Sequence, residues 1–505
     1  MRQNQVIFIC IDGADRDLIF QWANADLLPT FKDLLRKGAF GFTEDPPGIN
    51  GCHWPTFFSG VSPVTHGRYW SQQIQPGTYE IGPTQFEWEP FWNVLSRAGR
   101  KIALIDPPEA RISENLNGIQ ISEKYNPKPN EPAIQTYPSS LRAEIEAKFG
   151  KDAIGSPRFC GRDLTEIQEF CQSLTRSIDK KKRLSSYFLN QKDWDLFITS
   201  FRESHWVGHQ CWHLHDPNHP EDDQNVVNVI GNPIQDIYIK IDAAIGELLQ
   251  QVSSEATVFV FASTSMEPNY TGVHLLDQIL LRLENPQTAN QNEGINNALN
   301  YLKKYKFLRQ LKKSILKPIQ KGKGKKKQWS DNLSPRKCFQ VPISEAFGGI
   351  RVNLVGREPQ GRIQPGQEYE AFCEDLCKEL LALVNVETGE PLIRNIIKSN
   401  EIYRGYRPIG YPDLLFEWNR NAPITSVYSD RIGNVKKVYW DSRTGDHKSG
   451  GLFFGLGLEI KPGRIEKSSS IVDFAPTIAS LLEVELPQTD GKSLAEALFP
   501  EASLR

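Results

Sequence analysis

The segment 193–216, DWDLFITSFRESHWVGHQCWHLHD, constrains the fold most, because it joins an apolar run to a cluster of histidines. The run Leu196–Phe201 has the length and composition of a strand that is buried on both faces. His205 and His209 follow it, and a spacing of four residues places both imidazoles on one face if this stretch is helical. Two such imidazoles can bind one metal ion, although an exposed run of His, Trp and Gln without a role has the same composition.

The bulk composition is that of an ordinary globular protein. The chain has 505 residues, a net charge of −2 and 39% hydrophobic residues, so its charge gives no reason to expect nucleic acid or a membrane surface as the main partner. Its eight cysteines contain no CxxC pair, which argues against a disulfide framework or a zinc ribbon. The first apolar run is too short for a signal peptide, and none approaches transmembrane length. We therefore expect a cytoplasmic protein.

A second apolar run, Val6–Ile11, predicts a central parallel strand. Asp12 follows it directly and precedes Gly13. In an open α/β sheet, ligands bind at the carboxyl ends of the strands, so Asp12 stands where a ligand for a cation is expected. A simple turn aspartate before glycine is the alternative.

Further motifs follow in a distinctive order. The first is 45–67, DPPGINGCHWPTFFSGVSPVTHG. The others are FWNVL at 91–95, IDPP at 105–108, FRESHWVGHQCW at 201–212, IRVNLVGRE at 350–358, YPDLL at 411–415 and TGDH at 444–447. This order resembles the alkaline phosphatase superfamily, in its branch of type I phosphodiesterases and nucleotide pyrophosphatases. The resemblance implies an α/β fold with a central, mostly parallel sheet flanked by helices and an inserted cap.

The resemblance also implies a metal site at His205, His209 and His447. Relatives bind their first metal through an Asp, a His four residues later and a distant C-terminal His. Here the Asp has become His205, which keeps a metal ligand and removes its negative charge. Three histidines around one ion leave a coordination position open for water or substrate. We therefore expect one divalent metal ion, with zinc favoured and iron or manganese as alternatives.

The ligands of the family's second metal are mostly replaced. Asp12 is present, but Thr264 and Ser265 stand where relatives have an Asp-His pair. Counting back from Trp54, Asn50 stands at the position of the nucleophile. Asparagine cannot accept a phosphoryl group as a serine or threonine does. The sequence therefore predicts that the second metal and the covalent step are both lost.

The remaining polar residues of these loops have proposed roles. His53 is a candidate general acid, with a loop histidine as the equal alternative. Glu203 and Glu267 are candidate bases, although surface ion pairs are the simpler interpretation, and His213, His215 and His219 are expected to be solvated. The expected catalytic residues are Asp12, Asn50 and His53. The expected substrate-binding residues are Asn50, Gly51, Thr264 and Ser265.

The expected domain organisation is a core interrupted by a cap. Residues 1–275 form the first part of the core, 276–342 a lysine-rich insertion, and 343–505 a second part that returns to the same sheet. The lysine-rich stretch 303–327 either contacts an anionic surface or forms a mobile loop.

The sequence favours a metal-dependent hydrolase or group-transfer enzyme that acts on a small anionic substrate, a phosphate- or sulfate-type ester, without a covalent nucleophile. Cys52 lacks the Cys-x-Pro-x-Arg pattern of a sulfatase. Three alternatives remain: a catalytically degenerate metal- or anion-binding protein, a non-hydrolytic metalloenzyme that uses iron, for example, and a nucleophile at Thr56 or Ser59.

Overall fold

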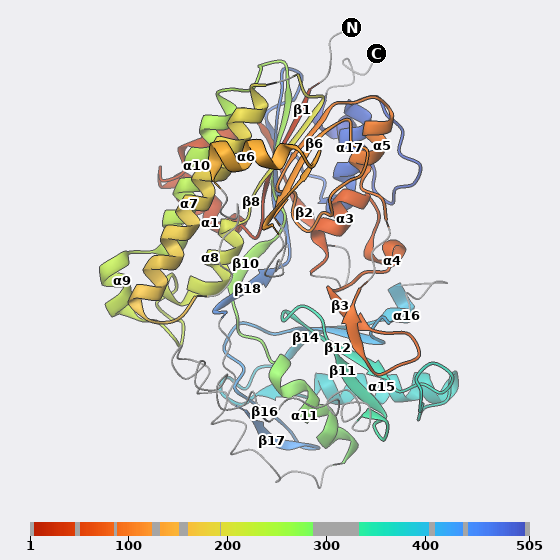
Figure 1. Ribbon diagram of the computed structural model, residues 1–505. Coiled ribbons are helices and arrows are strands. Elements are labelled where there is room, and N and C mark those ends of the chain that lie inside the picture. Colours follow the sequence, from red (N-terminus) through yellow and green to blue (C-terminus); the bar gives the residue numbers. More distant parts are fainter. Residues whose placement is uncertain are drawn as a thin grey trace.

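The computed structural model describes residues 5–45, 51–84, 88–123, 132–150, 160–191, 193–285, 333–402, 410–437 and 443–499. Its helices and strands form two lobes that lie one above the other (Figure 1). The upper lobe contains one large sheet with helices on both sides, and the lower lobe contains smaller sheets. The lysine-rich stretch 303–327 lies outside the described residues.

The upper lobe is built on a ten-stranded sheet in the order β20-β2-β19-β9-β1-β8-β5-β6-β7, with β21 also paired to β2. Its strands are Val6–Ile11 (β1), Ala39–Glu44 (β2), Ile102–Ile105 (β5), Gly118–Glu123 (β6), Ile134–Tyr137 (β7), Leu196–Phe201 (β8), Thr257–Ala262 (β9), Gly451–Leu456 (β19), Gly463–Arg464 (β20) and Ser469–Ser470 (β21). The central pairs β1–β8, β1–β9, β5–β8 and β5–β6 are parallel, whereas β19 and β7 run antiparallel to their neighbours. The predicted fold class is confirmed.

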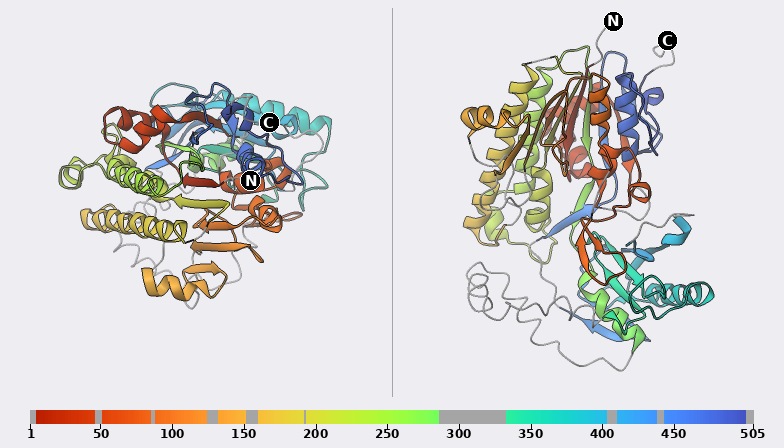
Figure 2. Two further views of the ribbon diagram at one scale, coloured as in Figure 1. Left: turned by 90° about the horizontal axis from the view of Figure 1, so that it is seen from above. Right: turned by 45° about the vertical axis from the view of Figure 1, so that its right-hand side comes forward.

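Two groups of helices cover the two faces of this sheet (Figures 1 and 2). One face packs against Arg16–Asn24 (α1), Pro29–Lys37 (α2), Leu164–Leu189 (α7), Glu203–Cys211 (α8) and Pro233–Leu249 (α10). The other packs against His53–Ser59 (α3), Phe91–Arg97 (α5), Phe474–Leu481 (α17) and Ala495–Leu498 (α18). Every residue of β1 and β8 is buried, as expected for strands between two helix layers. Among the described helices, none combines the length and apolar character needed to cross a membrane.

Short elements complete the upper lobe and its lower border. They are Pro63–His66 (α4), Leu141–Phe149 (α6), Trp212–Leu214 (η1), Gln224–Ile230 (α9), Ser265–Pro268 (β10), Gly445–Lys448 (β18) and Ile471–Asp473 (η4). The hairpin of Gln72–Ile74 (β3) and Ile81–Pro83 (β4) lies in the lower lobe, where Ile74 and Tyr79 pack with Phe339 and Val341 (Figure 1). The strands β10 and β18 form a separate antiparallel pair, which lies between the two lobes in Figure 1.

The lower lobe has its own hydrophobic core. Its elements are Val273–Glu284 (α11), Cys338–Val341 (β11), Phe347–Val352 (β12), Gln367–Leu381 (α15), Val384–Asn385 (β13), Ile393–Lys398 (β14), Ser399–Ile402 (α16), Leu414–Trp418 (β15), Ser426–Ser429 (β16) and Gly433–Lys436 (β17). They include an antiparallel sheet in the order β11-β12-β15-β14 and a smaller sheet in the order β13-β16-β17. Apolar side chains of α11 and α15 pack with those of both sheets.

The lower lobe spans more of the chain than the predicted cap at 276–342. The strands from β12 to β17 pair with one another and not with the large sheet, which the chain rejoins only at β19. The expected return at residue 343 therefore differs from the observed return at Gly451. The reason is that an apolar strand pattern shows burial but does not show which sheet the strand will join.

His66 ends the short helix α4 and has a structural role. Its Nδ1 accepts a hydrogen bond from the backbone N–H of Arg68 at 3.1 Å, and its Nε2 lies 3.0 Å from the hydroxyl of Thr56. Burial lowers the pKa of His66 to about 3. The imidazole is therefore neutral in the folded protein at pH 5, where an exposed histidine would be mostly protonated.

We expect His66 to make the protein less stable as the pH falls from about 6.5 to about 3. In this window the unfolded chain binds the proton and the folded chain does not, so the free energy of unfolding falls by about 1.4 kcal/mol per pH unit through this residue. In a His66→Gln variant the free energy of unfolding should depend less steeply on pH, which urea unfolding between about pH 6.5 and 4.5 measures. An unchanged dependence would contradict this explanation.

Candidate metal centre

The candidate site lies at the carboxyl ends of three neighbouring parallel strands. Ile11 of β1 is in register with Phe201 of β8 and with Ala262 of β9. Asp12 and Ser263 follow two of these residues directly, and α8 begins at Glu203, two residues after Phe201. The sheet therefore delivers the ends of these segments to one place, as expected for a ligand site in an open α/β sheet.

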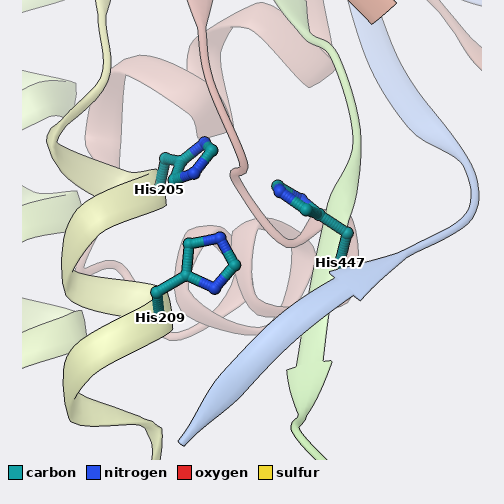
Figure 3. Close-up of side chains that lie close together, drawn as sticks. All are labelled: His205, His209 and His447. Carbon is teal, nitrogen blue, oxygen red and sulfur yellow. The ribbon is translucent and has the colours of Figure 1, made fainter. Parts of the chain in front are cut away.

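Three histidines converge at this place. His205 and His209 project from one face of α8 toward His447 of β18 (Figure 3). The ring centroids of His205 and His209 lie 4.6 Å apart, and each lies 4.8 Å from that of His447. Their candidate ligand atoms all lie within 4.8 Å of one another, and this is the one group of that kind in the described part of the chain. The structure thus brings together the three residues that the sequence selected.

Close backbone packing holds β18 against α8. The Nδ1–H of His209 donates to the carbonyl oxygen of Gly445 at 2.7 Å, and the N–H of Thr444 donates to the carbonyl oxygen of His209 at 2.7 Å. A Cβ atom added to Gly445 would lie only 2.2 Å from the carbonyl oxygen of Gly208. Position 445 therefore requires glycine, and this close approach brings His447 to the other two histidines.

Asp12 orients His205. One oxygen, Oδ2, lies 2.9 Å from His205 Nδ1, while Oδ1 accepts hydrogen bonds from Trp54 Nε1 at 2.9 Å and from the Ser263 hydroxyl at 3.3 Å. Burial raises the pKa of Asp12, but the neighbouring His205 outweighs this and holds it well below its usual range. An ionised carboxylate bonded to Nδ1 keeps that proton in place and leaves Nε2 available, which is a common arrangement around metal-binding histidines.

The donor set fits a divalent metal ion. His209 Nε2 and His447 Nδ1 are buried and have no hydrogen-bond partner among the described residues, which is costly unless something else binds them. Burial lowers the pKa of both histidines well below the ordinary value, and nearby positive groups add to the effect. Both imidazoles are therefore neutral, and the neutral form is the one that binds metal.

The other predicted substrate-binding residues are placed as follows. Thr264 donates its hydroxyl to the carbonyl oxygen of Lys448 at 3.0 Å, and the Ser265 hydroxyl accepts from the N–H of Arg16 at 3.2 Å. Both side chains are buried in these structural contacts. Gly51 has a φ of 130°, a conformation that favours glycine, and Asn50 lies outside the described residues. Substrate binding by these residues stays a prediction.

His53 is the first residue of α3 and forms a buried pair with Asp45. Its Nε2 lies 2.7 Å from Asp45 Oδ1, and the two side chains are 8% and 9% exposed. Burial lowers the pKa of His53, but the charge of Asp45 more than offsets this, so the net pKa is raised. Sequence reasoning missed Asp45, Trp54 and Ser263 as neighbours of the site. Ser263 could have been found from its position, because it directly follows the strand β9 as Asp12 directly follows β1.

The two candidate carboxylate bases form ion pairs. Glu203 is fully buried and lies 3.1 Å from Lys181 Nζ, and Glu267 lies 2.5 Å from Arg420. Both carboxylates are ion-paired, but the expectation of a surface position was wrong for Glu203, which packs between α7 and the sheet. The expectation that the histidines after α8 are solvated was wrong for two of them. His213 is 3% exposed, because η1 packs beside β18 and the Nδ1 of His213 contacts the hydroxyl of Thr444. His219 is 8% exposed.

The fold and the histidine cluster define an α/β protein with a candidate metal centre at the carboxyl ends of its central strands. Residues 6–329 match the family of type I phosphodiesterases and nucleotide pyrophosphatases. The match covers more than half of the chain, so the protein belongs to this enzyme family of the alkaline phosphatase superfamily. No curated protein matches the chain.

Solved structures support the same fold. Phosphonoacetate hydrolase from Sinorhizobium meliloti, in complex with phosphonoformate, superimposes with a TM-score of 0.54 at 12% identity, over 95% of this chain and 96% of that chain. An inactive form of murine ectonucleotide pyrophosphatase/phosphodiesterase 5, in complex with AMP, gives a TM-score of 0.51 at 11% identity, over 97% of both chains. At these identities the likeness concerns the fold alone.

We expect an Asp12→Asn variant to bind zinc about 10- to 100-fold more weakly, because the carboxylate that orients His205 is lost. Isothermal titration of the metal-free protein with zinc measures this change. Asp33→Asn, which removes a carboxylate on the surface of α2, is the matched control and should leave the affinity unchanged. Equal zinc affinity of Asp12→Asn and the unaltered protein would show that Asp12 does not support the metal centre.

Proposed function

We propose that the protein is a metal-dependent hydrolase or group-transfer enzyme that acts on a small phosphate- or sulfate-type ester through one metal ion held by His205, His209 and His447. The convergence of three imidazoles, two of which carry buried nitrogens without partners, is the observation that supports this proposal most strongly. Family membership supports chemistry at an ester of phosphoric acid. Zinc fits three neutral nitrogen ligands, and iron or manganese are alternatives.

A divalent ion at three neutral ligands would supply a Lewis acid that polarises an ester oxygen. The chain's own contribution is to hold the imidazoles in place. The backbone carbonyl of Gly445 fixes the Nδ1 proton of His209, and the Asp12 carboxylate orients His205. The three ligands add no negative charge, so the centre favours an anionic substrate.

The surrounding residues supply proton transfer and substrate binding in this proposal. His53 holds a proton with the help of Asp45 and gives it to the leaving group as the ester bond breaks. Asn50 and the N–H of Gly51 are assigned here to a substrate oxygen, and Thr264 and Ser265 are assigned to substrate binding beside the end of β9. Water or an acceptor alcohol attacks, so hydrolysis and transfer use the same residues.

No described side chain next to Asn50 competes as a nucleophile in this proposal. Cys52 is buried, and burial raises the pKa of its thiol far above the usual range, which disfavours the reactive thiolate. Thr56 and Ser59 lie within α3, where Thr56 contacts His66 and Ser59 contacts backbone carbonyl groups. These contacts support a mechanism without a covalent intermediate.

A cytoplasmic location also belongs to this proposal. All eight cysteines are free thiols, which suits a reducing compartment. The expected partner is a small anionic molecule and not a nucleic acid, given the net charge of −2.

A catalytically degenerate binding protein is the second candidate. The hydroxyls of Thr264 and Ser265, which stand where relatives carry metal ligands, are both engaged with the backbone, and this favours a site without a second metal. A single metal without turnover would bind an anionic ligand and raise the melting temperature in its presence.

The proposal predicts different effects for two variants. His205→Ala should lose both the metal and the turnover of phosphate diesters, because a ligand is removed. Asn50→Ala should keep the metal and lower turnover by about tenfold or more, as expected for one lost contact to a charged oxygen. Metal content by elemental analysis and release of p-nitrophenol from bis(p-nitrophenyl) phosphate are the two measurements.

His215→Ala is the control for these variants, because His215 follows α8 but contacts Asn232 and not the metal centre. It should keep both the metal and the turnover. Full turnover by a metal-free His205→Ala protein would rule out the proposed mechanism. Metal binding and ligand-dependent stabilisation without turnover of any ester would favour the binding protein.

A further inference from the structure

A second feature of the molecule is a cavity of about 600 Å³ between the two lobes. Its upper wall comes from β2, β20 and the loop after β18, and its lower wall comes from β12, β14 and β15. The polar lining residues are Arg16, Thr43, Glu44, Asp45, Asn395, Glu417, Ser449, Arg464, Glu466 and Ser468. This volume lies within the usual range for small-molecule sites.

Two arginines share one aromatic ring in this cavity. The guanidinium carbons of Arg16 and Arg464 each lie 5.1 Å from the centre of the Phe42 ring. Arg464 is exposed and, within the described part of the chain, its side chain contacts the Phe42 ring but makes no hydrogen bond or ion pair. Its donors are therefore available to a ligand, and the stacking on Phe42 limits the orientations of the side chain.

Asp45 also lines the cavity, and one of its carboxylate oxygens is buried. The side chain of Asp45 is 9% exposed, and its Oδ1 contacts His53 at 2.7 Å. Among the described residues, its second oxygen, Oδ2, has no hydrogen-bond partner. An unpartnered buried carboxylate oxygen is costly, and a hydroxyl group that donates to it would remove that cost.

The charges of the lining residues nearly balance. Asp45 faces His53, and Glu417 lies 3.3 Å from Arg394 outside the cavity. The other charges are the guanidiniums of Arg464 and of Arg16, which lies 3.5 Å from Asp17, and the exposed carboxylates of Glu44 and Glu466. Such a cavity offers many donors and acceptors but little net charge, so it suits a neutral group with several hydroxyls better than a simple ion.

The cavity neighbours the candidate metal centre. Ser449 and Gly450 line it and follow His447 by two and three residues. Asp45 lines the cavity, and its Oδ1 contacts His53. The cavity is therefore joined to the candidate site through the residues that follow His447 and through the Asp45–His53 pair.

We propose that the cavity binds a polyhydroxylated leaving group, such as a sugar or cyclitol, with Arg464 and Asp45 contacting its hydroxyls. This inference rests on the proposed function, because it assumes that the ester group binds at the three histidines. It narrows the substrate class to phosphate esters of polyols. It also gives Asp45 two roles, since the carboxylate that holds His53 contacts the leaving group that receives the proton.

The test compares three probes by isothermal titration on the zinc-loaded protein: myo-inositol 1-phosphate, methyl phosphate and free myo-inositol. The inositol phosphate should bind about tenfold tighter than methyl phosphate, as expected for one or two added polar contacts. Arg464→Gln should remove this advantage and the binding of free inositol. Arg431→Gln, which removes an arginine paired with Glu379 in the lower lobe, is the matched control and should bind all probes normally.

The probes separate the two proposals. Methyl phosphate reports on the metal centre alone, and free inositol reports on the cavity alone. Equal affinities for the two phosphates, or an unchanged Arg464→Gln variant, would overturn the cavity assignment and leave the proposed function intact. Binding of inositol that depends on Arg464, without metal-dependent binding of methyl phosphate, would keep a polyol site in the cavity but overturn the proposed function and the assignment of a leaving group.

Discussion

The contact between β18 and α8 is the constraint on which the site depends. His447 is more than 230 residues from His209 in the sequence. The hydrogen bond from His209 to the carbonyl oxygen of Gly445 holds the two segments together in space. The bond also determines which nitrogen of His209 carries the proton, and so which nitrogen is available to a metal. Gly445 permits the contact because a side chain there would collide with the backbone of α8.

A buried network of charges fixes the start of α8. Lys181 of α7 is fully buried and lies 3.0 Å from Asp106 and 3.1 Å from Glu203, the first residue of α8. Arg202 adds contacts to Asp106 at 3.4 Å and to Glu123 at 3.1 Å. Removing one partner of such a network leaves an uncompensated buried charge, which costs about 3–5 kcal/mol. The network thus ties α8 to the sheet, so His205 and His209 have a rigid support.

Local sequence patterns were sufficient for the central strands and for the pair of histidines in α8, and the family resemblance supplied the fold class. Val6–Ile11 and Leu196–Phe201 are recognisable as strands, and the strand bounds match these runs. The spacing of His205 and His209 predicted that both lie on one face of a helix, and the family resemblance indicated His447 as the third candidate ligand.

Features that depend on contacts between distant segments could not be predicted. The pairing of Ser263 with Asp12 joins the ends of two strands that lie 251 residues apart in the sequence. Asp45 and His53 are only eight residues apart, but no repeating pattern in the sequence predicts their pairing. The same limit explains the lower lobe, since the runs at 347–352 and 414–418 are apolar enough for either sheet. His213 was expected in solvent because its burial depends on β18, which lies far along the chain.

Anomalous X-ray scattering from a crystal of the zinc-loaded protein would locate the metal ion. We expect one strong peak, bounded by the imidazoles of His205, His209 and His447, with a nitrogen of each within about 2.1 Å. We also expect no second peak near Asp12, Thr264 and Ser265. Two peaks about 4 Å apart would restore the two-metal mechanism, and the absence of a peak among the histidines would contradict the proposed metal centre.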